Sequence, residues 1–329
     1  MTATDLKAEA DFSVGTNRLG VYLAFLQFVF TLLWAAYVVY LPKLAAEVGM
    51  APGAVILILM MDQAIFTVTD TAMGIAADRI SALTGRLGVF VGALTAISCA
   101  AFVALPFVAG AGMGARTSLI ALIATWAITS SALRAPPLIL LAQHSARPQL
   151  PFLSAVVLLG YGLAGALSPY LGAVLRDRDP RLPFAIASVV LLFTALLLSK
   201  VERDGAAIGS PVKPSRPAKP FGTIPMIFVA AMIALALGYQ LHFSINSEPF
   251  YLRFARRADL PWLMPVFWIG FNIAMFPASR VMRHRGGLIV MGIAGLFGAV
   301  AVLVAEMAGN LTTLVVAQFI AGSAWGCML

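Results

Sequence analysis

Residues 287–308 read GLIVMGIAGLFGAVAVLVAEMA, an apolar run in which Glu306 is the one charged residue. A helix of about 20 such residues is long enough to cross the hydrocarbon core of a bilayer. Runs of this kind recur along the whole chain, so that hydrophobic residues make up 61% of the 329 residues and charged residues 11%. Soluble domains carry about 25% charged residues. The composition therefore predicts an integral membrane protein.

Ten membrane-spanning helices are predicted from the apolar runs. Barrel strands are excluded because they would show alternating segments of about ten residues in place of continuous runs. We expect the spans at residues 19–42, 52–77, 87–108, 117–142, 150–175, 182–200, 222–245, 262–281, 287–308 and 311–329. The predicted fold class is therefore all-α, a polytopic transmembrane helix bundle.

The longest polar stretch, ERDGAAIGSPVKPSRPAKPF at 202–221, has the proline and lysine content of an extended linker. It predicts an N-terminal segment 1–18, a six-helix bundle 19–201, the linker itself and a second bundle 222–329 with four helices. Thirteen lysines and arginines fall on the N-terminal side of the membrane and eight on the other side. By the positive-inside rule, we expect a cytoplasmic N-terminus and a plasma membrane location, in a bacterium the inner membrane.

Several classes of function are excluded or disfavoured by the residues present. The net charge of +8 is scattered over short connections and forms no basic helix, so a nucleic-acid partner is not expected. No P-loop motif occurs, so ATP is not a visible energy source. Cys99 and Cys327 both lie in apolar runs and predict packing, with neither a disulfide framework nor a metal site. No cofactor is expected.

The connection after the second run carries a recognisable motif. It reads Gly74-Ile-Ala-Ala-Asp78-Arg79, then Ile80-Ser-Ala-Leu-Thr, then Gly85-Arg86. This resembles the Gly-x-x-x-Asp-Arg-x-Gly-Arg loop of the major facilitator superfamily, with four additional residues between the two pairs. A degraded copy, PASRVMRHRG at 277–286, lacks the acidic residue. The stretches 37–49 and 165–173 also resemble family signatures, the latter an element of the family's antiporters.

The resemblance implies two pseudo-symmetric bundles of six helices, of which the second is incomplete here, as if truncated after the tenth helix. It also implies transport of a small solute by alternating access, without a chemical step and with possible coupling to protons by symport or antiport. The loop motif then forms a conformational latch on the cytoplasmic side. The latch residues are Gly74, Asp78, Arg79, Gly85, Arg86, Arg280 and Arg283.

In the family, the first helix of each three-helix unit lines the solute cavity, which here means the first, fourth, seventh and tenth runs. These runs carry polar and aromatic residues at helical spacing, so that each set lies on one helix face. The predicted cavity residues are Gln27, Thr31, Trp34, Trp126, Ser130, Arg134, Tyr239, His242, Asn246, Gln318 and Trp325. The alternatives are interhelical packing and, for Arg134, a reach to the cytoplasmic surface, a pair with a carboxylate or the binding of a substrate anion.

Four residues are candidates for proton coupling: Asp62, Asp70, His242 and Glu248. Asp62 lies deepest in a predicted span, where an ionised carboxylate is costly and a protonated one can carry a proton. Its alternative is a structural pair with a basic residue or a helix N-terminus. His242 is either a titratable group beside Glu248 or a hydrated residue at a helix end.

Two other functions compete with transport. A membrane-embedded enzyme would use the carboxylates of Asp62 and Asp70, although we expect no enzymatic activity. A truncated family member would be a non-transporting or sensor-like protein. The expected partners of a carrier are a small-molecule substrate, the lipid bilayer and protons, while the oligomeric state does not follow from the sequence.

Overall fold

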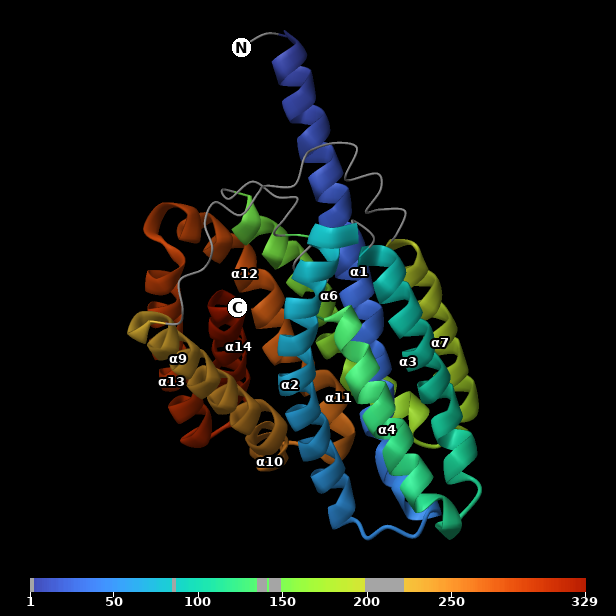
Figure 1. Ribbon diagram of the computed structural model, residues 1–329. Coiled ribbons are helices and arrows are strands. Elements are labelled where there is room, and N and C mark those ends of the chain that lie inside the picture. Colours follow the sequence, from blue (N-terminus) through green and yellow to red (C-terminus); the bar gives the residue numbers. More distant parts are fainter. Residues whose placement is uncertain (1–2, 85–86, 135–140, 142–148, 199–221) are drawn as a thin grey trace. The chain divides into compact units, whose positions relative to one another are not determined.

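The computed structural model describes residues 3–84, 87–134, 141, 149–198 and 222–329 (Figure 1). In these ranges the chain is helical and contains no strand. Nine helices there are long and apolar enough to cross a membrane, and a tenth apolar helix, α7 (Arg181–Leu196), is shorter. Each of the ten predicted runs corresponds to one of these helices. The prediction of an all-α multispan bundle is confirmed.

The chain divides into two compact units. Unit 1 comprises residues 1–164 and 171–211, and unit 2 comprises residues 165–170 and 212–329. The helices of unit 1 are α1 (Ala3–Glu47), α2 (Gly53–Thr84), α3 (Leu87–Ala109), α4 (Arg116–Ser130), most of α6 (Leu150–Leu175) and α7, with the 3-10 turns η1 (Met113–Ala115) and η2 (Ser131–Leu133). In Figure 1, α3 lies between α4 and α7, and α7 also packs on α1.

Aromatic rings fill the core of unit 1. Trp126 of α4 is fully buried and stacks on Trp34 of α1, with ring centroids 5.7 Å apart. Tyr37 and Phe102 contact the same indole at 4.6 Å and 5.3 Å. Because aromatic pairs contribute about 0.5–1.5 kcal/mol beyond their buried area, this cluster fixes α1, α3 and α4 to one another.

Unit 2 is built around α14 (Leu311–Met328), which packs on both α12 (Pro265–Arg285) and α13 (Gly287–Glu306). The chain enters this unit through α9 (Thr223–Gln240), the π-helical turn η3 (Leu241–Asn246), α10 (Ser247–Leu252), the turn η4 (Arg257–Asp259) and α11 (Leu260–Leu263).

The contact between α12 and α14 depends on glycine. A Cβ atom at Gly322 would lie 1.8 Å from the carbonyl oxygen of Phe267, and one at Gly326 would lie 2.5 Å from that of Phe271. Conversely, a Cβ atom at Gly270 would lie 2.2 Å from the carbonyl oxygen of Phe319. Small residues permit such close approach between membrane helices, where packing replaces the hydrophobic effect as the source of association.

Three helix ends differ from the predicted spans. Helix α2 continues to Thr84 and α12 to Arg285, beyond the predicted ends at 77 and 281. The four additional residues of the Asp78 motif therefore extend α2 by about one turn, which their helix-compatible composition allows. In contrast, α4 ends at Ser130, twelve residues before the predicted end of that span at 142.

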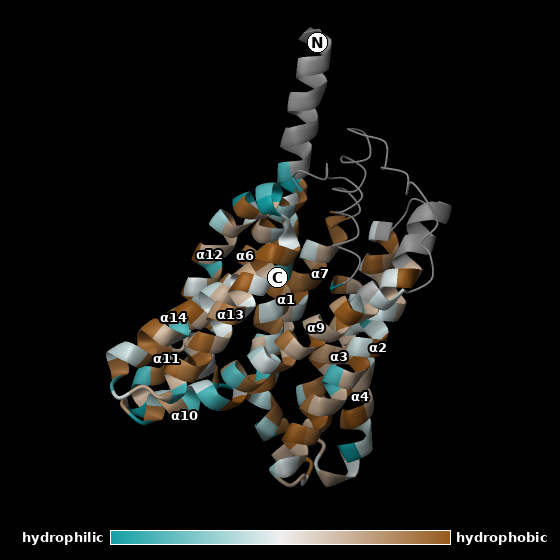
Figure 2. Cartoon of the chain, turned by 90° about the vertical axis from the view of Figure 1, so that its left-hand side faces the viewer, coloured by the Kyte–Doolittle hydropathy of each residue, from teal (hydrophilic) through white to brown (hydrophobic). Residues whose placement is uncertain are grey.

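The outer faces of the helices are apolar, as a lipid environment requires. Figure 2 shows hydrophobic residues along the helices and hydrophilic residues gathered near their ends, for example around α10 and α11. Many large apolar side chains are exposed, among them Leu57, Val68, Val189, Leu296 and Leu303. A water-soluble protein rarely exposes so much contiguous apolar surface, so these faces are suited to contact with lipid.

Candidate functional site

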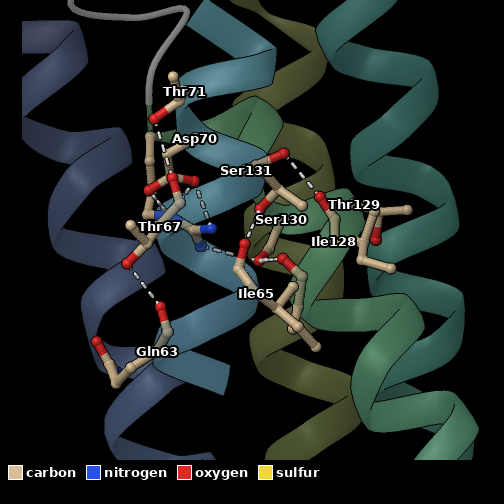
Figure 3. A network of polar contacts seen from close by, with 12 residues as sticks. Gln63, Ile65, Thr67, Asp70, Thr71, Ile128, Thr129, Ser130 and Ser131 are labelled. Atoms are coloured by element: carbon tan, nitrogen blue, oxygen red, sulfur yellow. Dashed lines mark hydrogen bonds and ion pairs between the residues drawn. The ribbon is translucent and has the colours of Figure 1, made fainter. Parts of the chain in front are cut away.

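An ion pair joins α2 to the end of α4 inside unit 1. The Arg134 Nη2 atom lies 2.7 Å from Asp70 Oδ1, and Arg134 Nε donates to both carboxylate oxygens at 2.9 Å and 2.8 Å. Figure 3 shows Asp70 on α2 and Ser130 on α4 facing each other across this contact. The pair is partly buried, with 17% of the arginine side chain and 33% of the aspartate side chain exposed. Of the alternatives for Arg134, the structure shows the pair with a carboxylate.

The guanidinium of Arg134 is held on two further sides. Its Nη1 atom donates to Ser130 Oγ at 2.9 Å, and its Cζ atom lies 3.9 Å from the ring centroid of Phe66. The Phe30 ring is at 5.6 Å. A desolvated cation over an aromatic face is stabilised by about 2 kcal/mol. The side chain is thus fixed in one orientation by a carboxylate, a hydroxyl and a ring.

The early end of α4 places Arg134 at this position. The hydroxyls of Ser130 and Ser131 donate to the carbonyl oxygens of Ala127 and Ile128, three residues back, at 3.0 Å and 2.7 Å. Such local hydrogen bonds compete with the α-helical pattern. Pro136 has no N–H, so an α-helical bond to the carbonyl of Ala132 is impossible. The helix tightens into η2, and Arg134 follows directly after it.

A cavity of about 370 Å³ lies beside the ion pair, within unit 1. It is lined by α1, α2, the residue after η2, and α6. The lining residues are Gln27, Phe30, Thr31, Trp34, Gln63, Phe66, Thr67, Asp70, Arg134 and Tyr161. Of the predicted cavity residues, the structure brings Gln27, Thr31, Trp34 and Arg134 together here. Trp126 and Ser130 are buried behind them.

Sequence reasoning missed the contribution of α2 to this wall. Gln63, Phe66, Thr67 and Asp70 follow one another at positions i, i+3, i+4 and i+7, which is the signature of one helix face. The signal was present in the sequence. It was overlooked because the resemblance directed attention to the first, fourth, seventh and tenth runs.

Asp62 forms a second, separate polar contact in unit 1. The Tyr37 hydroxyl donates to Asp62 Oδ2 at 2.8 Å, and both side chains are fully buried. The other carboxylate oxygen, Oδ1, has no hydrogen-bond partner among the described residues. The alternative to a proton-coupling role for Asp62 was a structural pair with a basic residue or a helix N-terminus. Among the described residues, its partner is instead a phenol hydroxyl on α1.

In unit 2, the residues predicted from the seventh and tenth runs form a neutral network. His242 Nε2 lies 3.0 Å from Gln318 Oε1, and the amide of Gln318 donates to Ser247 Oγ at 3.2 Å. His242 and Gln318 are 3% and 0% exposed. The expectation of a hydrated histidine at a helix end was therefore wrong. Neither is it beside the carboxylate of Glu248, which lies on the surface 3.5 Å from Arg257.

The π-helical turn places His242 in this position. The Ser247 N–H donates to the carbonyl of His242, five residues back, and its hydroxyl donates to the same oxygen at 3.0 Å. Pro249 has no N–H to donate to Ile245, so an α-helical bond is impossible there. Single π-helical turns are frequent at functional sites. Of the other residues predicted in this unit, Tyr239 and Trp325 stack on each other with ring centroids 4.3 Å apart. Asn246 is half-buried.

The predicted latch is described only in part. The side chains of Asp78 and Arg79, and residues Gly85 and Arg86, lie outside the described residues. Gly74 is half-buried on α2. Arg280 and Arg283 are exposed near the C-terminal end of α12. Arg283 lies in the last turn, where a positive charge interacts favourably with the negative end of the helix dipole.

Comparison with known protein families identifies the family of this chain. The sequence matches the family model of the Major Facilitator Superfamily over residues 23–329. No curated protein matches the chain. Because the matched region spans nearly the whole length, the chain belongs to the major facilitator superfamily, whose members are membrane transporters and not enzymes.

Proposed function

We propose that this chain is a proton-coupled secondary transporter that moves a small solute by alternating access. The solute binds in the cavity of unit 1, and Asp62 carries the proton. The observation that carries the proposal is a fully buried carboxylate, with one unpartnered oxygen, directly behind the cavity wall.

Two contacts connect Asp62 to the cavity. Gln63, its neighbour in sequence, lines the cavity. Tyr37, its hydrogen-bond partner, packs on Trp34 of the cavity wall with ring centroids 5.4 Å apart. A change in the charge of Asp62 therefore alters the electrostatic environment of the indole and amide groups that would contact a solute.

The surroundings of Asp62 favour a carboxylate that gains and loses a proton during transport. An ionised carboxylate without a cation is costly in the membrane interior. The cation Arg134, which directly follows the turn η2 that packs against α2, is already bonded to Asp70. Arg116 at the start of α4 donates to the Gly49 carbonyl at 2.5 Å, and α3 carries Cys99 as its titratable group. Within the described ranges, Tyr37 is thus the polar partner of Asp62, and it stabilises the ionised form by donating its hydrogen.

The test is solute uptake and proton flux in liposomes that contain the purified chain, under an imposed pH gradient and with a panel of radiolabelled charged and uncharged solutes. The comparison is between Asp62→Asn and Asp259→Asn. The two substitutions make the same chemical change, but Asp259 is a half-buried residue of η4, outside the cavity, that bonds Arg256. We expect gradient-driven uptake in the wild type and in Asp259→Asn, and its loss in Asp62→Asn with solute exchange retained. Unchanged gradient-driven uptake in Asp62→Asn would contradict the proposal.

A further inference from the structure

The charge of the cavity limits the charge of its solute. Asp70 and Arg134 are the charged side chains among the lining residues, and each satisfies the other through three hydrogen bonds. The wall is therefore neutral as a whole. A solute with a net charge would enter a partly desolvated space without a counter-charge, and it would have to break the ion pair to find one. Removing one partner from such a pair is unfavourable, because the other charge is then left buried without a counter-charge.

The aromatic part of the wall offers flat apolar contact. Phe30, Trp34, Phe66 and Tyr161 come from three helices and line one cavity. The Phe66 ring has the guanidinium of Arg134 on it at 3.9 Å, and the Trp34 indole is supported from behind by Trp126. Rings that are fixed in this way present large contact area at little cost in conformational entropy.

The uncharged polar part of the wall offers both donors and acceptors. Gln27 and Gln63 each carry an amide with two N–H groups and one oxygen. The hydroxyl hydrogens of Thr31 and Thr67 are donated to the backbone carbonyls of Gln27 and Gln63, at 2.8 Å and 2.9 Å. Their oxygens thus act as acceptors, and that of Thr31 already accepts from the Gln27 amide at 3.4 Å, with one lone pair remaining. These groups recognise hydroxyls and amides, and none of them requires a charged ligand.

From these three observations we infer that the unit 1 cavity selects an uncharged solute that has a flat ring face on one side and hydrogen-bonding hydroxyl or amino groups on the other. The inference rests on the proposed transport function and names its substrate class. The volume of about 370 Å³ falls in the range of small-molecule sites and admits a molecule of one or two rings. A carbohydrate ring and a planar heterocycle with hydroxyls share this chemistry.

The experiment measures equilibrium binding to the full chain in lipid nanodiscs, without any gradient, by calorimetry. The two main probes are 4-nitrophenyl β-glucoside and 4-nitrophenyl β-glucuronide, which differ in one carboxylate. Methyl glucoside and adenosine separate the two ring types. We expect the glucoside to bind at least about tenfold more tightly than the glucuronide, a difference of about 1.4 kcal/mol. Binding of methyl glucoside, or of adenosine, then assigns the ring face to a sugar or to a heterocycle.

Variants test whether the binding occurs in this cavity. Gln63→Leu removes an amide from the wall, and we expect it to weaken glucoside binding by about tenfold, as loss of a paired polar group in a binding site does. Thr125→Val is the control, because Thr125 is an exposed residue of α4 outside the cavity. Equal or tighter binding of the glucuronide would overturn the inference, and so would the absence of binding by all uncharged probes to a chain that melts cooperatively. Since no gradient is used, neither outcome depends on proton coupling.

Discussion

In unit 1, α2 and α4 are joined by a charged contact between Asp70 and Arg134, next to a cavity. In unit 2, the second and fourth spans after the linker, α12 and α14, meet through glycines at backbone distance. Family members are built from duplicated halves, so these are corresponding pairs of helices. Neither α14 nor residues 265–279 of α12 contain a charged residue.

The difference shows two ways of holding helices together in a membrane. A side-chain ion pair leaves space between the helices and can exchange its partners when a ligand or a proton enters. A glycine contact leaves no space, because the backbone of one helix occupies the position of the missing side chain. We therefore propose that the solute binds beside the α2 and α4 pair and that the α12 and α14 pair provides rigidity.

The largest loss of stability against unfolding is expected from Gly322→Ala in unit 2. The added Cβ atom would lie 1.8 Å from the Phe267 carbonyl oxygen, so α12 and α14 must move apart along their whole contact. Overpacking typically costs about 1–3 kcal/mol and occasionally more, and a clash with backbone belongs at the upper end. Thermal unfolding in detergent, followed by circular dichroism, measures the loss.

The matched control is Gly292→Ala on α13, where no atom lies within 4 Å of the added Cβ atom. We expect this variant to unfold at or slightly above the wild-type temperature, since alanine favours a helix over glycine by about 1 kcal/mol. If both variants were equally stable, the glycine contact would not be the feature that holds these helices together.

The second-largest effect on the free energy of unfolding is expected in unit 1, from the interaction between Asp70 and Arg134. Asp70→Asn or Arg134→Gln leaves one partly buried charge unpaired, and we expect a cost of about 2 kcal/mol, below the 3–5 kcal/mol of fully buried pairs because both groups retain some exposure. The double variant removes both charges and should lose less than the sum of the single variants. A double-mutant cycle of unfolding free energies measures this coupling.

The same cycle distinguishes an ion pair from two independent residues. Strict additivity of the two substitutions would show that the charges do not interact, and the assignment of a neutral cavity wall would then fail. Arg253→Gln provides a reference, because its pair with Glu306 is exposed and is expected to contribute less than about 1 kcal/mol.

The sequence was sufficient for the fold class and for the positions of the ten apolar helices, because continuous apolar runs have few alternatives in a membrane chain. It was also sufficient to identify Arg134 and Asp70 as candidate site residues. It was not sufficient to pair them, since the contact joins α2 to the end of α4 across 64 positions and depends on where α4 ends.

Two further features of the structure could not be predicted from the periodicity of the sequence. The π-helical turn at Leu241–Asn246 directs the His242 side chain toward Gln318, whereas a regular α-helix would direct that side chain elsewhere. The partner of Asp62 is a tyrosine in a cluster of aromatic residues. The spacing of such residues predicts that their rings pack in the core, but it does not indicate that one hydroxyl donates a hydrogen bond. Local backbone irregularity and amphipathic side chains account for both errors.

The third effect tests the buried network of His242, Gln318 and Ser247 in unit 2. Gln318→Leu leaves His242 Nε2 buried without its partner, and an unsatisfied buried group costs about 1–3 kcal/mol. Gln318→Glu keeps the shape but introduces a charge and should be at least as unfavourable, unless the histidine becomes protonated. Unfolding temperatures measured between pH 5 and pH 8 separate these cases, because a Glu–His ion pair would make the glutamate variant more stable in acid. A leucine variant as stable as the wild type would show that the network is dispensable.

The smallest effect concerns the start of α14, the helix on which the rigidity of unit 2 depends. The Asn310 side chain accepts a hydrogen bond from the Thr313 N–H at 2.8 Å and so caps the first turn. Replacing an N-cap asparagine with alanine costs about 1 kcal/mol, whereas aspartate accepts the same bond and also favours the positive end of the helix dipole. We therefore expect Asn310→Ala to lower the unfolding temperature slightly and Asn310→Asp to preserve it. Since the cap lies in unit 2 and outside the cavity, binding of the uncharged probe should be the same in both variants. A loss of probe binding in Asn310→Ala would mean that the ordering of α14 influences the unit 1 cavity, and the division between a binding pair and a rigid pair of helices would have to be abandoned.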